Sequence, residues 1–77
     1  MALSTAEWAE RFAARLGTAP PSEEELTLLL DLAGVAAHAS ERTSAPVSCW
    51  LAARAGTRPA DALQLARQLA EELGAGP

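Results

Sequence analysis

Proline and glycine divide this chain into four segments, each about as long as one helix. The breaks lie between Gly17 and Pro21, around Pro46, and between Gly56 and Pro59. Proline cannot lie inside a regular helix, and glycine is the residue most often found just beyond a helix C-terminus. The segments between the breaks are rich in alanine, the strongest helix former. We therefore expect an all-α fold, a compact bundle of about four helices.

A serine followed three residues later by glutamate occurs at two of the expected helix starts, at Ser4 and at Ser22. In this capping box the two side chains pair with backbone N–H groups that would otherwise lack a partner. The pattern predicts one helix from Ser4 or Thr5 to a stop at Gly17. It predicts a second helix over residues 23–42.

The two later helices are predicted from proline at their starts. Pro46 suits the first turn of a third helix that ends at Gly56, and Pro59 opens a fourth helix with Asp61 near its start. The apolar residues of this fourth helix form one stripe, which consists of Ala62, Leu63, Ala66, Leu69, Ala70 and Leu73.

The length of 77 residues is enough for one small domain. We expect residues 1–77 to form a single helical domain, with residues 1–3 and 74–77 frayed. A chain of this size buries only about 60% of the surface that its unfolded form exposes, so we expect a small free energy of unfolding.

The second predicted helix is apolar over more than half of its circumference. One face carries Leu26, Leu29, Leu30, Ala33, Ala36 and Ala37, and Leu28, Leu32 and Ala39 extend it on one side. Such a helix lies at the centre of its own fold or at a contact with a second chain. We expect it to be the central helix, with the other three packed against it. Trp8 and Trp50 are expected in the core, with an exposed anchor for a partner as the alternative.

The charge and the reactive residues exclude several classes of function. A net charge of -4 with scattered arginines argues against a nucleic-acid or anionic-membrane surface. A single cysteine and a single histidine allow neither an internal disulfide nor a zinc site within one chain. The N-terminal residues resemble neither a signal peptide nor a membrane anchor. We expect a cytoplasmic protein without a cofactor.

A line of polar residues crosses the second helix on the side away from the leucines. The candidate binding residues are Asp31, Gly34, His38, Glu41 and Arg42 on this line, together with Trp50 on the third helix. Their spacing of three or four residues makes the helical members surface neighbours.

Each of these candidates also has a purely structural interpretation. His38 is a candidate proton donor or acceptor, but a lone histidine is more often held by a neighbouring carboxylate or carbonyl. Glu41 and Arg42 either cap the following loop or recognise an anion. Gly34 admits a close approach by a backbone or ligand, or allows tight helix packing, or has no structural reason.

Cys49 is expected to behave as a small hydrophobic residue on the third helix. Nucleophilic use of its thiol needs a nearby base and a lowered pKa, and His38 is the only candidate base. We do not expect an enzyme.

The run from His38 to Gly56, with the segments before it, resembles a family of small uncharacterised bacterial helical domains, and the resemblance covers essentially the whole chain. The resemblance rests on the AHASER segment at residues 37–42 and on the residues that follow this segment. It also includes the tryptophan-containing first helix and the Pro-Ser-Glu-Glu-Glu sequence that starts the second helix. The later matching positions are Ala45, Pro46, Trp50, Leu51 and Gly56. Members of that family occur alone or fused behind molybdenum cofactor guanylyltransferase, which joins GMP to molybdopterin.

This resemblance implies the biosynthetic process in which the domain takes part, and it does not imply that the domain catalyses a reaction. The chain has no glycine-rich phosphate loop and no βαβ pattern, so we do not expect it to carry out the transferase reaction itself. We expect a non-catalytic accessory domain of molybdenum cofactor biosynthesis that binds a protein, with the transferase as the partner that the resemblance implies and a homodimer as a further option. The alternative is a small domain that binds an anionic, nucleotide or pterin ligand through His38, Glu41 and Arg42.

Overall fold

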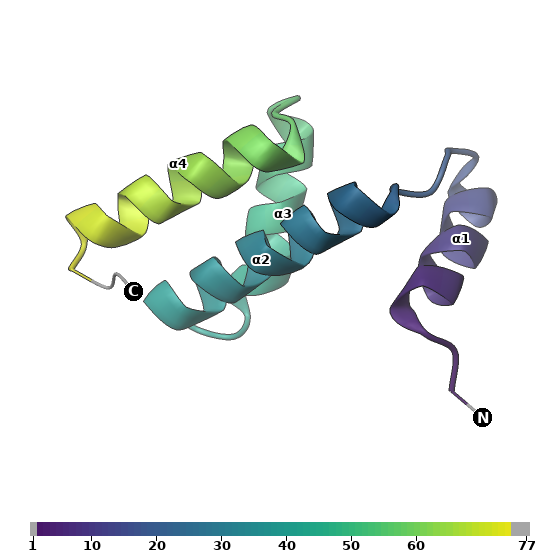
Figure 1. Ribbon diagram of the computed structural model, residues 1–77, viewed down its shortest axis with the longest axis horizontal. Helices are drawn as coiled ribbons and strands as arrows, with labels where there is room; N and C mark the ends of the chain where they lie inside the picture. Colours follow the sequence, from purple (N-terminus) through teal and green to yellow (C-terminus); the bar gives the residue numbers. More distant parts are fainter. Residues whose placement is uncertain (1, 75–77) are drawn as a thin grey trace.

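The computed structural model describes residues 2–74 and contains four α-helices (Figure 1). They are α1 (Thr5–Leu16), α2 (Glu23–Ala39), α3 (Ser44–Arg54) and α4 (Pro59–Glu72). No strand occurs within the described residues, which confirms the predicted all-α fold. The expected fraying of residue 1 and of residues 75–77 lies outside the described residues.

Both predicted capping boxes are present at the helix starts. At α1, the Glu7 N–H donates to Ser4 Oγ at 3.1 Å and the Ser4 N–H donates to Glu7 Oε1 at 2.9 Å. At α2, Ser22 and Glu25 make the same pair of bonds at the same distances. Each box gives partners to two backbone donors that the helix itself leaves free, which sets where the helix begins.

The predicted glycine stops are also present. Gly17 and Gly56 have φ angles of 77° and 71°, in the left-handed region that glycine adopts without steric cost. After Gly56, the Thr57 N–H donates to the Ala52 carbonyl at 3.0 Å, which closes the end of α3 and turns the chain toward α4.

The boundary between α2 and α3 differs from the prediction. The second helix ends at Ala39 and not near Arg42, because Ser40 leaves the helical region with φ -135° and ψ -106°. The Ser44 hydroxyl then donates to Ser40 Oγ at 3.1 Å across the turn. The third helix starts at Ser44, two residues before Pro46, and this leaves the proline in the first turn, where a missing N–H carries no penalty.

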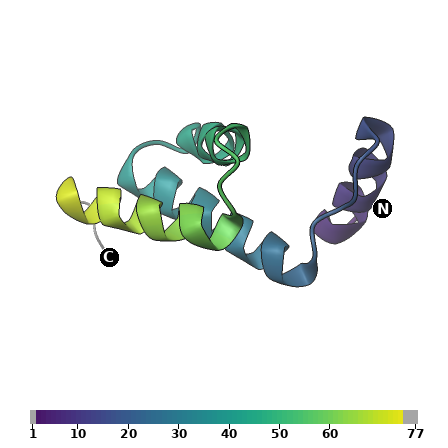
Figure 2. The same ribbon diagram turned by 90° about the horizontal axis from the view of Figure 1, so that it is seen from above.

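Helix α2 is the centre of the fold, as predicted. Both α3 and α4 pack on it, and α3 crosses it on one side (Figures 1 and 2). The core between them consists of Leu32, Ala62 and Leu63, with Leu28, Val35, Cys49, Ala52 and Ala66 partly buried around it. These residues hold three helices together with few large side chains.

The face of α2 that enters the core is rotated from the expected one. Leu32 is 3% exposed, whereas Leu30, which was expected on the central face, is 55% exposed. The apolar arc of α2 is wider than its neighbours can cover, so the hydrophobic pattern alone does not select which half is buried. The packing of α3 and α4 selects the half around Leu32.

Helix α1 projects away from the other three helices (Figures 1 and 2). It does not pack on α2 as α3 and α4 do, so the expectation that three helices surround α2 holds for only two of them. The connection after α1 contains Pro20 and Pro21, whose fixed φ angles stiffen it. As a result, the large apolar side chains of α1, which are Trp8, Phe12 and Leu16, remain exposed.

Candidate functional site

The predicted polar line occupies the outward side of α2. Asp31, Gly34 and His38 are all exposed there, as is Thr27, whose Oγ1 donates to the Glu23 carbonyl at 3.1 Å. None of these side chains lies in a cleft formed with α3 or α4, because those helices cover the opposite side around Leu32. The line is therefore a solvated helix face.

Glu41 and Arg42 lie in the turn after α2, not on the helix where we expected them. Both are exposed, and Glu41 Oε2 accepts a hydrogen bond of 3.4 Å from Thr43 Oγ1. Within residues 2–74 no hydrogen bond or ion pair joins either residue to His38. The early end of α2 at Ser40 is the reason, since it interrupts the helical spacing. The predicted ligand site at these residues remains a prediction.

Gly34 has open space where a side chain would be. A Cβ atom built on this residue meets no other atom within 4 Å. No other part of the described chain therefore requires a glycine here. A role in admitting a partner remains a prediction.

Trp50 and Trp8 are both exposed, so the expectation that they belong to the core is wrong. Trp50 is 58% exposed on the outward side of α3, and the Arg54 guanidinium carbon lies 5.0 Å from the centroid of its ring. Helix α3 packs on α2 through the smaller side chains of Cys49 and Ala52. Because Trp50 lies on the opposite side of the same helix, it faces solvent.

Cys49 belongs to the packed side of α3, in agreement with its prediction as a small hydrophobic residue. Its Sγ lies 3.9 Å from the Leu29 carbonyl oxygen, and burial raises the pKa of the thiol. A raised pKa disfavours the thiolate that nucleophilic chemistry needs. His38 lies on the outward side of α2, so the two side chains do not face each other.

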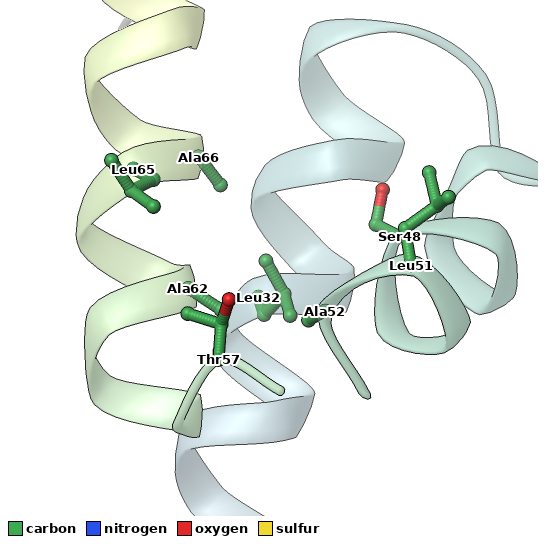
Figure 3. A pocket seen from close by; sticks show the side chains of 8 residues that line it. All are labelled: Leu32, Ser48, Leu51, Ala52, Thr57, Ala62, Leu65 and Ala66. Carbon is green, nitrogen blue, oxygen red and sulfur yellow. The ribbon is translucent and has the colours of Figure 1, made fainter. Parts of the chain in front are cut away.

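Sequence reasoning missed an apolar groove between α3 and α4. Its volume is about 210 Å³, its floor is Leu32, and its two walls carry Leu51 and Leu65 (Figure 3). The other lining residues are Ser48, Ala52, Thr57, Ala62 and Ala66. None of the predicted binding residues is among them.

The groove exists because α3 and α4 both pack on α2 and hardly contact each other. Alanines line much of it, so the side chains between the two helices do not fill the space. A sequence signal was present along α4 and at its C-cap, where Leu65, Leu69 and Leu73 recur at intervals of four residues. All three are exposed, because the buried face of α4 is centred on Leu63 and its alanine neighbours.

Two other classes of site can be tested against residues 2–74. No group of three or more His, Cys, Asp or Glu side chains in this part of the chain is placed to hold a metal ion. No helix in the same part combines the length and the apolar character needed to cross a bilayer.

The chain matches the family described as a domain of unknown function (DUF6457) over residues 2–76. No curated protein and no solved structure matches it. The family match includes all four helices and both sides of the groove.

Proposed function

The chain belongs to the DUF6457 family, and from the surface that this member exposes we propose that it is a non-catalytic domain that binds a protein partner. The observation that carries this proposal is the distribution of apolar side chains. Within residues 2–74 the buried hydrophobic residues are three alanines and two leucines. Both tryptophans, the phenylalanine and most of the leucines of α4 are exposed. Exposed apolar patches mark interaction sites in soluble proteins, and Val47, Trp50 and Leu51 are three exposed apolar side chains close together on α3.

The outward face of α3 is the surface we assign to the partner. It presents Trp50 between Val47 and Arg54, and we call these three residues the Trp50 surface. Tryptophan and arginine are the residues most enriched among those that dominate binding energy at protein interfaces. The indole is already held under the guanidinium group of Arg54, so little side-chain freedom is lost when a partner covers it.

The partner we propose is molybdenum cofactor guanylyltransferase. This choice rests on the resemblance of residues 37–56 to domains that occur fused behind that enzyme. Trp50 lies inside this segment, and it is the largest exposed side chain there. A domain fused to the transferase is held beside it by the shared chain. A separate domain with the same surface would bind the transferase through that surface instead. The chain then acts as an accessory domain in molybdenum cofactor biosynthesis.

Isothermal titration calorimetry with the guanylyltransferase of the same organism tests this proposal. We expect saturable binding of the intact chain, and we expect Trp50→Ala to weaken it by about 30-fold or more. The matched control is Arg67→Ala, a charged and exposed position on α4 outside the Trp50 surface. The proposal is wrong if no heat of binding is found at several hundred micromolar, or if both variants weaken binding equally.

A further inference from the structure

Helix α1 carries an apolar stripe that has no partner within the described chain. Trp8, Phe12 and Leu16 follow one another at intervals of one turn and are 59%, 50% and 63% exposed. The rings of Trp8 and Phe12 stack with their centroids 5.8 Å apart. Their stacking already orders both side chains on one face, as expected of a helix that binds in a groove through residues at i and i+4.

The groove between α3 and α4 has the character that such a helix needs. It is open and is lined mainly by leucine and alanine, and Leu69 and Leu73, which follow Leu65 at intervals of one turn, are also exposed. Its volume of about 210 Å³ is below the range of about 300 to 1,000 Å³ that is usual for small-molecule sites. Side chains inserted from a helix fit this space better than a whole cofactor or nucleotide.

The solvent-accessible surface of the chain is larger than that of a compact monomer of the same mass, and the difference indicates how much area a second copy could bury. One chain exposes 6014 Å², whereas a compact monomer of 8.0 kDa exposes about 4,450 Å². The radius of gyration is 13.2 Å, compared with about 11.5 Å for a compact chain of this length. Burying the excess of about 1,500 Å² on each of two copies would make an interface in the range of obligate homodimers.

We propose that two copies of this chain form a two-fold dimer in which α1 of each copy lies in the groove between α3 and α4 of the other. Trp8 and Phe12 enter the groove between Leu51 and Leu65, and Leu16 extends the contact. Every copy carries one stripe and one groove, so reciprocal exchange satisfies both and closes the assembly at two chains.

A second copy suits this surface better than a foreign helix for two reasons. The stripe and the groove are present in equal number on every chain, and the excess area has the size that a dimer of this chain needs. The core of α2, α3 and α4 is also small, and small domains commonly gain the missing burial by association. A dimer supplies that burial without a further protein.

Sedimentation equilibrium of the full chain from 1 to about 300 μM, without any other protein, tests the dimer. We expect a mass of twice 8.0 kDa for the intact chain, and we expect Trp8→Ala to raise the dimer Kd about 30-fold or more. The matched control is Glu10→Ala on the other face of α1, which should change Kd by no more than about threefold. A monomer at every concentration, or a dimer that Trp8→Ala leaves intact, overturns the proposal.

A groove variant tests where α1 binds. Leu65 is exposed in the single chain, so Leu65→Glu should leave the helix content measured by circular dichroism unchanged while it weakens the dimer as strongly as Trp8→Ala. Equimolar mixing of the two variants restores one intact stripe-to-groove contact and places both substitutions at the other contact. Because Trp8 and Leu65 meet at the same contact in this dimer, their losses there should not add, so the mixture should associate more tightly than either variant alone. If Leu65→Glu has no effect, or if mixing gives no rescue, the two α1 helices pair with each other and the groove assignment is wrong.

The dimer does not depend on the proposed function, because it uses α1 and the groove and not the Trp50 surface. Trp50→Ala should leave the dimer Kd unchanged, and Trp8→Ala should leave the Trp50 surface intact. Loss of transferase binding and loss of dimerisation can therefore be observed separately.

Discussion

The guanidinium carbon of Arg54 lies 5.0 Å from the centroid of the Trp50 ring, one turn away on the solvent side of α3. A cation placed over an exposed aromatic ring contributes about 0.5 to 1 kcal/mol. We expect Arg54→Gln to lower the free energy of unfolding by no more than this amount, and Trp50→Ala to have a similarly small effect. Urea titration followed by circular dichroism measures both. A loss above about 3 kcal/mol for Trp50→Ala, typical of a buried aromatic residue, would contradict the exposed position.

Replacing Gly34 with alanine should stabilise the protein. Glycine inside a helix costs about 1 kcal/mol relative to alanine, and the added methyl group at this position meets nothing within 4 Å. Gly56→Ala is the matched control, because the φ angle of 71° there is strained for any other residue, so that variant should be less stable. The urea midpoints of the two variants should move in opposite directions. A destabilising Gly34→Ala would mean that a close neighbour occupies the open space.

Leu32 should be the most sensitive position on α2. It is 3% exposed and touches both α3 and α4 through the core, so Leu32→Ala should cost about 2 to 5 kcal/mol and should unfold much of the chain. Leu30→Ala removes the same atoms from a half-exposed position on the same helix and should cost far less. Thermal unfolding followed by circular dichroism compares the two. Equal losses would show that the buried half of α2 is wrongly assigned.

Glu7 should make the start of α1 sensitive to acid. The backbone N–H and then the hydroxyl of Ser4 hydrogen-bond its carboxylate, and they lower the pKa of Glu7 below its ordinary value of 4.5. Since the pKa is lower in the folded chain than in the unfolded chain, this contribution is complete above pH 4.5 and is lost as the pH falls through the folded pKa. An NMR titration of the Glu7 side chain should show a lower midpoint in buffer than in urea. Identical midpoints would mean that the capping box does not form in solution.

The Cys49 thiol should react slowly with alkylating agents. Burial raises its pKa above the ordinary value of 9.0, so the thiolate is scarce at pH 8, and the packed side of α3 limits access. A suitable control is Ala53→Cys in a Cys49→Ala background, which places the thiol on an exposed position of the same helix. The rate of iodoacetamide modification should be higher in this control. Fast reaction of Cys49 itself would reopen the possibility of a reactive thiol.

The candidate site shows how far a helical pattern predicts a surface. Asp31, Gly34 and His38 lie on one exposed face, as their spacing indicated, because residues three or four apart on a helix are neighbours. Glu41 and Arg42 leave that face because the helix ends early at Ser40. The groove was not predictable from any single helix, since its floor comes from α2 and its walls come from α3 and α4.

The amino-acid sequence by itself determined where α1, α2 and α4 begin and where α1 and α3 end. Each capping box joins a serine and a glutamate three residues apart, Ser4 with Glu7 and Ser22 with Glu25. Each glycine stop depends only on the backbone conformation of the glycine and on the residues next to it. Such interactions are complete within one helical turn, so a local pattern is enough to predict them.

Only the tertiary structure decided which apolar residues are covered. The sequence offers more hydrophobic side chains than four short helices can bury, and α2 alone is apolar around most of its circumference. Which half of α2 is covered depends on where α3 and α4 meet it. The exposure of Trp8, Phe12 and Leu16 on α1 depends on how little α1 packs against the other helices in the described part of the chain. Burial is set by the sum of contacts from distant segments, and these contacts leave no periodic signal within one helix.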